Sequence, residues 1–217
     1  MLGIDQAAAD AFHRAKILPW LATGGSKYRQ NSGEPVEGEG FVFLPLQLPN
    51  DSVVALKLFD APYLEGVRRM VAALAGAGVP VVLKRHPHCA DPAVGRLLDS
   101  LPPGPVTVSR ASVHALIARA RAVLTVNSGV GFEALLHGRP VVVAGRAEYR
   151  AAATELTDPE AAPAAVAAAE AAHDPEFARR YVFLAMNGHQ IDTRDPVSFQ
   201  RAALRALCRS YLERAPR

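Results

Sequence analysis

Polar residues follow several apolar runs of this chain, and their types suit phosphate binding and carboxylate chemistry. One apolar run ends at Asn127, Ser128 and Gly129, and a helical pattern containing Gly131 and Glu133 follows. A helix N-terminus beside a serine hydroxyl favours an anion. The pattern therefore predicts a phosphate site here, with Glu133 in the first helical turn accepting hydrogen bonds from sugar hydroxyls. The competing interpretation is an ordinary serine N-cap followed by an ordinary acidic residue.

A second polar group follows the run VPVVL. Lys84, Arg85 and His86 come directly before Pro87, and a residue before proline is held in an extended conformation. The His86 ring can then point into a cleft and donate to a phosphate, while the two preceding cations add positive charge. A lone histidine at a strand end is usually structural, so the prediction depends on His86 and Ser128 converging from adjacent strand ends.

A carboxylate follows the run FVFLPLQL. Gln47 and Asp51 lie at the end of this run, and Pro49 and Asn50 between them indicate a turn. In this position Asp51 is a candidate nucleophile or general base for a substrate held nearby. The alternative interpretation is that Asp51 only begins the turn.

The glycine-rich loop TGGSKYRQNSGEPVEGEG also contains candidates. Lys27 and Tyr28 interrupt it and are predicted to close over a sugar carboxylate or a phosphate. A solvated loop is the alternative.

These polar residues follow short apolar runs that alternate with helical segments. The runs predict strands at 41–48, 79–85, 105–108, 122–127 and 140–144. The alternation is typical of parallel strands joined by right-handed crossovers. We therefore expect an α/β fold, a Rossmann-like parallel sheet of about five strands flanked by helices. Ligands bind such sheets outside the carboxyl ends of the strands, which is where the candidates lie.

The chain divides into three parts by composition. Residues 1–40 hold an N-terminal amphipathic helix at 7–21 and the glycine-rich loop, and residues 41–150 hold the Rossmann-like domain. Residues 151–217 read as a helical C-terminal segment that packs on the same domain and ends in an amphipathic helix.

Composition bounds the kind of partner. The net charge of +3 comes without a run of five Lys or Arg, and aromatic residues make up 6% of the chain. Nucleic acid therefore ranks last among the partners considered, because no basic stripe with interleaved aromatics occurs.

Cysteine content and hydropathy bound the compartment. Cys89 and Cys208 have neither metal-ligand spacing nor a disulfide framework around them, which favours a reducing cytoplasm. No run of 18 apolar residues occurs, so we expect a cytoplasmic protein that is not transmembrane and that reaches the inner membrane only through a partner.

Three stretches taken together resemble a known family. PLQLPNDSVV, KRHPHCAD and VNSGVGFEALLHGRPVVVAGRAEY resemble, in order and spacing, the bacterial capsule polysaccharide biosynthesis family of retaining β-Kdo glycosyltransferases, which use CMP-β-Kdo as donor. The SKYRQ stretch is similar to a Ser-Lys-Tyr element of the same proteins. The resemblance covers about residues 26–149.

The resemblance implies a GT-B-like fold in which residues 41–150 form the nucleotide-sugar-binding lobe. His86 and Pro87 are then expected to bind the CMP phosphate together with Ser128, through a His-Pro motif shared with bacterial sialyltransferases. Glu133 is the implied ribose contact.

The resemblance also implies the chemistry. Asp51 is the expected nucleophile, with Gln47 nearby, because a retaining transfer needs a carboxylate that attacks the anomeric carbon and is then displaced by the acceptor. No metal or other cofactor is expected beside the CMP-sugar donor. The expected acceptor is a cell-surface polysaccharide or glycolipid.

Alternatives stay open at this point. A complete GT-B enzyme has two lobes, so the acceptor lobe is missing, very short or supplied by another chain. A sialyltransferase-like inverting enzyme or a polyol-phosphate transferase would use a base in place of a nucleophile. A catalytically inactive nucleotide-binding partner in polysaccharide assembly would bind CMP without needing Asp51.

Overall fold

The structure is a computed structural model, and it describes residues 3–24, 34–102, 104–189 and 197. The predicted site residues Lys27 and Tyr28 lie outside these residues, as does the amphipathic helix expected near the C-terminus. Within the described residues, no helix is long and apolar enough to cross a membrane.

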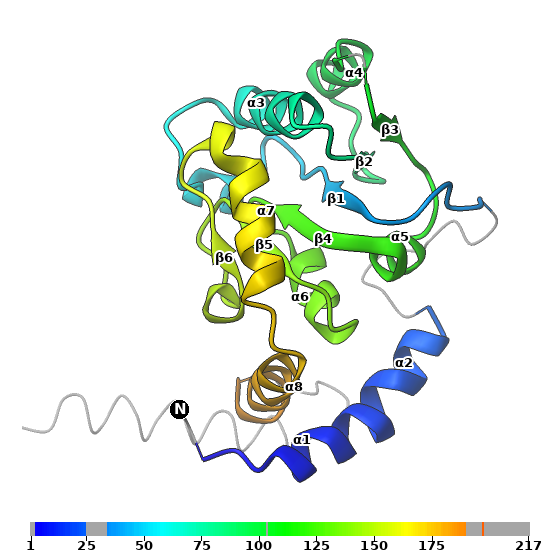
Figure 1. Cartoon of the computed structure of the whole chain (residues 1–217), viewed down its shortest axis with the longest axis vertical. Helices are drawn as coiled ribbons and strands as arrows, with labels where there is room; N and C mark the ends of the chain where they lie inside the picture. The colour runs from blue at the N-terminus through cyan, green and yellow to red at the C-terminus, as the bar shows by residue number, and fades with distance from the viewer. Residues whose placement is uncertain (1–2, 25–33, 103, 190–196, 198–217) are drawn as a thin grey trace, which may run out of the picture.

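One parallel sheet of six strands forms the centre of the molecule, in the order β3-β2-β1-β4-β5-β6 (Figure 1). The strands are β1 (Phe41–Pro45), β2 (Val81–Lys84), β3 (Val106–Val108), β4 (Ala120–Thr125), β5 (Val141–Val143) and β6 (Thr154–Glu155). The α/β class and the five predicted parallel strands are confirmed. The sixth strand, β6, lies in the segment expected to be helical, because two residues are too few to show a strand periodicity.

Strand β1 lies between β2 and β4, and its side chains enter two separate cores. Val42 and Leu44 face one core, whereas Phe41 and Phe43 face the other, as the period of two along a strand requires. All five residues of β1 are buried, which explains why the strand reads as a continuous apolar run.

Two layers of helices cover the sheet. On the face of Val42 lie α3 (Tyr63–Gly76), α4 (Pro92–Asp99) and α7 (Ala162–Ala171). On the face of Phe43 lie α5 (Val113–Arg119), α6 (Gly129–Leu136) and α8 (Pro175–Leu184). Short turns complete the chain, with 3₁₀ helices at Ser52–Leu56, Arg150–Ala152 and Pro159–Ala161 and a π-helical turn at Ala185–His189.

The N-terminal helix runs from α1 (Gln6–Phe12) through a π-helical turn (His13–Ile17) into α2 (Leu18–Ala22). This confirms the helix predicted at 7–21. Its α1 part lies beside α8 at the lower edge of Figure 1, and α2 continues upward on the right.

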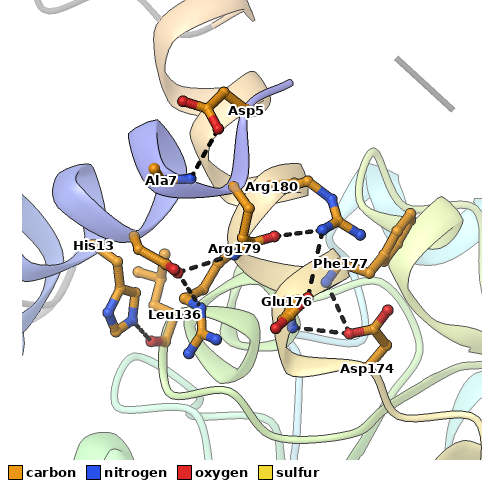
Figure 2. A network of polar contacts seen from close by, with 11 residues as sticks. Asp5, Ala7, His13, Leu136, Asp174, Glu176, Phe177, Arg179 and Arg180 are labelled. Atoms are coloured by element: carbon orange, nitrogen blue, oxygen red, sulfur yellow. Dashed lines mark hydrogen bonds and ion pairs between the residues drawn. The ribbon is translucent and has the colours of Figure 1, made fainter. Parts of the chain in front are cut away.

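Specific contacts join this N-terminal helix to the domain. Phe12 packs edge-on against Phe183, with the ring centroids 5.5 Å apart. Figure 2 shows the polar contacts, among them His13 Nε2 at 3.2 Å from the Leu136 carbonyl oxygen. Arg179 of α8 forms an ion pair of 2.8 Å with Asp10 of α1. The N-terminal helix is therefore joined to both α6 and α8.

Candidate functional site

The carboxyl edge of the sheet has a switch point between β1 and β4. The chain leaves β1 for α3 on one face, and it leaves β4 for α6 on the opposite face. Open α/β sheets bind ligands at such a point, outside the carboxyl ends of the two strands. The two loops carry Asp51 and Ser128.

Asp51 lies in the loop after β1 and begins the 3₁₀ turn Ser52–Leu56. Its side chain accepts a hydrogen bond of 3.2 Å from the Val53 backbone N–H, and the residue is exposed. The turn-initiating role considered from the sequence is thus present, and it leaves the carboxylate at the surface. The role of Asp51 as a nucleophile stays a prediction.

The turn after Asp51 is attached to the segment that follows β5. The Leu58 N–H donates to the Ala144 carbonyl at 2.8 Å, and the Arg146 N–H donates to the Leu56 carbonyl at 2.9 Å. These bonds flank an antiparallel bridge between Lys57 and Gly145. The loops after β1 and β5 therefore form one connected rim.

Gln47 and Asn127 form a buried amide pair across the switch point. The Gln47 Nε2 donates to the Asn127 Oδ1 at 3.0 Å, and the Asn127 backbone N–H donates to the Gln47 Oε1 at 3.1 Å. The side chains are buried, and the Gln47 N–H donates to the Tyr63 hydroxyl at 2.7 Å. A buried and satisfied polar pair of this kind fixes the relative position of the loops that carry it.

Ser128 caps helix α6, as the sequence predicted. Its hydroxyl accepts from the Val130 N–H at 3.3 Å, and it keeps an O–H available as a donor. A Cβ placed on Gly129 would meet no atom within 4 Å, so the first residue of the helix borders open space. The helix N-terminus thus has the room and the polarity for an anion.

Gly131 has a different reason to be glycine. A Cβ at this position would lie 2.3 Å from the hydroxyl oxygen of Tyr149 and 2.5 Å from its ring. The Tyr149 side chain is fully buried, and its hydroxyl donates to the Ser128 carbonyl. Burial raises the pKa of Tyr149, so the hydroxyl stays protonated and keeps this bond. Because Gly131 has no side chain, the Tyr149 ring fits against helix α6, and its hydroxyl reaches the Ser128 carbonyl.

Glu133 lies in the second turn of α6, so its predicted place in the first turn is wrong. Because the Ser128 cap starts the helix at Gly129, the first turn ends before Glu133. The Glu133 carboxylate lies 3.9 Å from His114 Nε2, and His114 in turn shares a 2.8 Å hydrogen bond with His137. The ribose contact expected of Glu133 stays a prediction.

His86 follows β2, and β2 is not a neighbour of β4. The expectation that His86 and Ser128 lie on adjacent strand ends is wrong, because β1 lies between the two strands and separates them by roughly 10 Å. The His86 Nδ1 accepts from the His88 N–H at 3.2 Å. A neutral imidazole that accepts at Nδ1 carries its proton on Nε2, which is then a donor.

Lys84 and Pro87 lie on either side of this histidine. The Lys84 Nζ donates to the Arg110 and Ala111 carbonyls at 3.1 and 2.7 Å, and burial lowers the pKa of its ammonium group. Lys84, the last residue of β2, therefore joins the end of this strand to the loop after β3. Its predicted contact with the donor stays a prediction, as does that of the exposed Pro87.

Three residues of the site had no assigned role in the sequence interpretation. Tyr149 holds Ser128, Thr125 accepts from the Ser128 N–H at 3.3 Å, and Arg146 lies exposed on the rim after β5. The strand predicted at 140–144 places Arg146 and Tyr149 shortly after a strand end. Nothing local in the sequence indicated that Tyr149 would reach Gly131.

The strand order and its switch point define a Rossmann-like lobe of the type found in GT-B proteins. The chain belongs to the capsule polysaccharide biosynthesis protein family, whose sequence profile matches residues 29–192.

Two relatives illustrate the range of similarity. The chain is 34% identical over 140 residues to the protein FixF of Sinorhizobium fredii, an alignment that covers 61% of this chain and 33% of FixF. The fold is similar to that of the Thermosulfurimonas dismutans KpsC beta Kdo 2,4 transferase, with a TM-score of 0.55 and 21% identity over 83% of this chain and 56% of that one. The chain thus spans a third to little more than half of these relatives.

Proposed function

We propose that this chain is the donor-binding lobe of a capsule polysaccharide glycosyltransferase that transfers Kdo, or a related 3-deoxy sugar acid, from CMP-β-Kdo with retention. The observation that carries the proposal is the position of Asp51 and the N-terminus of α6 on the two loops of one switch point. A carboxylate and an anion site on either side of this point suit attack on a sugar whose leaving group is a phosphate. The similarity of the fold to that of a Kdo transferase supports the choice of sugar.

The proposed reaction has two displacements at the anomeric carbon. A carboxylate oxygen of Asp51 attacks this carbon, the bond to the phosphate oxygen breaks, and CMP leaves with the bonding electrons. The acceptor hydroxyl then attacks the same carbon, loses its proton to water and releases the Asp51 carboxylate. Two inversions give net retention.

The leaving phosphate is the group that needs stabilisation. Negative charge grows on it as the glycosidic bond breaks, and the Ser128 hydroxyl, the N–H groups of the first turn of α6 and the His86 Nε2–H are the proposed donors. Each donor of this kind is worth on the order of 10²- to 10³-fold in rate. His86 starts one strand further away than Ser128, so it is proposed to contact the far side of the phosphate or the sugar carboxylate.

The acceptor is proposed to be a polysaccharide or glycolipid. Because the chain spans 56% of the KpsC structure that it matches, the proposal assigns part of the acceptor site to a second lobe. No metal takes part in the proposed reaction, since the donor has a single phosphate whose charge the proposed N–H and O–H donors neutralise in part.

The test is the intact mass of the purified chain after incubation with CMP-β-Kdo generated in situ. Wild-type protein is expected to gain the mass of one Kdo residue, and Asp51→Ala is expected to gain none. Asp60→Ala is the matched control, because Asp60 is another exposed aspartate nearby in the chain and should leave the adduct unchanged. An adduct that persists in Asp51→Ala would assign the nucleophile elsewhere.

CMP binding separates the remaining outcomes. Wild-type protein that binds CMP, turns over the donor and never carries an adduct would be an inverting enzyme. Protein that binds CMP without turnover would be a nucleotide-binding partner. Protein that binds no CMP would contradict the proposed function as a whole.

A further inference from the structure

The side chain of Asn127 uses its polar groups within the protein. Its Oδ1 accepts from Gln47, and its Nδ2 donates to the Val53 carbonyl at 2.6 Å and to the Arg146 carbonyl at 3.4 Å. A primary amide has two N–H donors, so both are directed at protein carbonyls. An N–H that is already bonded to the protein is a poor donor to a phosphate, although Asn127 comes directly before Ser128.

The bonds of Asn127 lead to the proposed nucleophile. Val53 accepts from the Asn127 Nδ2 through its carbonyl, and it donates through its N–H to the Asp51 carboxylate at 3.2 Å. The backbone of Val53 is thus bonded to the Asn127 side chain through its carbonyl and to the Asp51 carboxylate through its N–H. Any shift of Val53 moves the hydrogen bond that orients the carboxylate.

The other partner of Asn127 is itself fixed. Gln47 is buried, it bonds both the side chain and the backbone of Asn127, and its own N–H donates to the Tyr63 hydroxyl of α3. Helix α3, the loop after β1 and the loop after β4 are joined through this amide pair. Asn127 therefore links the two turns, since it directly precedes Ser128 and its side chain bonds to the turn that begins at Asp51.

We propose that Asn127 is a positioning residue, which sets the Asp51 carboxylate relative to the Ser128 turn and does not contact the donor. The proposal rests on the proposed function for its activity readout. It revises the sequence interpretation, in which Asn127 belonged to the donor-binding set and Gln47 to the catalytic set.

Asn127→Asp is the decisive variant, because it keeps the shape of the side chain and replaces the Nδ2 donor by an acceptor. The rate of Kdo-adduct formation is expected to fall about 100-fold, the effect of a displacement near 1 Å at a reacting group. The dissociation constant for CMP is expected to change less than about 3-fold. A parallel loss of CMP affinity and rate would overturn the proposal, because it would make Asn127 a donor contact.

The pH dependence gives a readout that a general loss of structure does not. The carboxyl group introduced by Asn127→Asp faces two carbonyls, so its protonated form is favoured and restores one donor to the Val53 carbonyl. The ratio of variant to wild-type rate is therefore expected to rise as the pH falls from 8 to 5. A ratio that stays constant over this range would count against the proposal.

Amide hydrogen exchange tests the geometry without any activity. Exchange at 51–56 is expected to accelerate in Asn127→Asp, while exchange at 129–136 stays close to that of the wild type. This result would uphold the link to the Asp51 turn even if the wild-type chain formed no Kdo adduct, in which case only the proposed function would fail. Equal acceleration in both segments would overturn the proposal.

Gln47→Glu is the second variant, should Asn127→Asp not fold. It keeps the acceptor for the Asn127 N–H and loses the donor to the Asn127 Oδ1. The same combination of a slower adduct, retained CMP affinity and faster exchange at 51–56 is expected. Wild-type exchange and rate in this variant would contradict the proposed role of the amide pair.

Discussion

The two sides of strand β1 differ in how they hold their polar residues. On the side of β4, Asn127 accepts a hydrogen bond from Gln47, and Ser128 donates to Thr125 and accepts from Tyr149. On the side of β2, His86 is part-exposed, and its Nδ1 accepts a hydrogen bond from the backbone of a residue two positions away. The comparison teaches that the Ser128 turn of the proposed phosphate site is held by contacts with the core. The His86 turn, on the other side of β1, is a local turn at the surface.

The largest expected loss of stability comes from a substitution on the β4 side, beside the Ser128 turn. Gly131→Ala places a methyl group 2.3 Å from the hydroxyl oxygen of a fully buried tyrosine, so the ring or the helix must move. Overpacking of this kind costs about 3 kcal/mol of the free energy of unfolding. Urea denaturation of the purified variant measures the loss.

Gly129→Ala is the matched control in the same helix. A Cβ at Gly129 meets no atom within 4 Å, and alanine suits a helix better than glycine, so its stability should be equal to or slightly above that of the wild type. Equal effects of the two substitutions would contradict the close contact between Tyr149 and Gly131.

A smaller effect is expected from removing the Tyr149 hydroxyl alone. Tyr149→Phe removes the tyrosine donor to the Ser128 carbonyl, which still accepts from the Gly131 N–H, and the loss of this one hydrogen bond costs about 1 kcal/mol. Thermal unfolding should show a Tm several degrees below that of the wild type.

Tyr181→Phe serves as the comparison for this loss. The Tyr181 hydroxyl donates to the Glu148 carbonyl at 2.6 Å in an exposed position, where water replaces a lost partner. Its Tm should therefore fall less than that of Tyr149→Phe. The reverse order would show that the bond behind Ser128 contributes little.

The same contrast explains what could be predicted from the sequence. The runs around Val42, Val82 and Val123 identified the strands because buried parallel strands are continuously apolar. The serine cap of α6 followed from its local pattern. Position after a strand also identified Asp51 and His86 as residues of the carboxyl edge.

The order of strands in space could not be read from the chain in the same way. The sequence does not reveal that β1 separates β2 from β4, since parallel strands are joined by crossovers that leave their neighbours undetermined. The bonds between Gln47 and Asn127 join residues 80 positions apart, and the contact between Tyr149 and Gly131 depends on how α6 lies on the sheet. Such tertiary contacts decide which polar residues hold the fold and which face outward at the carboxyl edge.

The smallest stability effect, and the sharpest test of the comparison, belongs to His86→Ala. His86 is part-exposed and follows the end of β2, so the free energy of unfolding should change by no more than about 0.5 kcal/mol, as for most substitutions near the surface.

The CMP affinity of His86→Ala, unlike its stability, should change markedly. A loss of about 10-fold is expected, because a charge-assisted hydrogen bond to phosphate is worth more than a neutral one. Calorimetric titration measures the CMP affinity of His86→Ala, and urea denaturation measures its stability. The unfolding curves of Gly131→Ala and Tyr149→Phe give the comparison for the other side of β1. A large loss of stability without loss of affinity in His86→Ala would reverse the assignment, since the turn after β2 would then support the fold. Lost CMP affinity with unchanged stability would instead mean that His86 serves binding and not the fold. The bound CMP-sugar would then draw the His86 turn toward the Ser128 turn, which the core already holds in place.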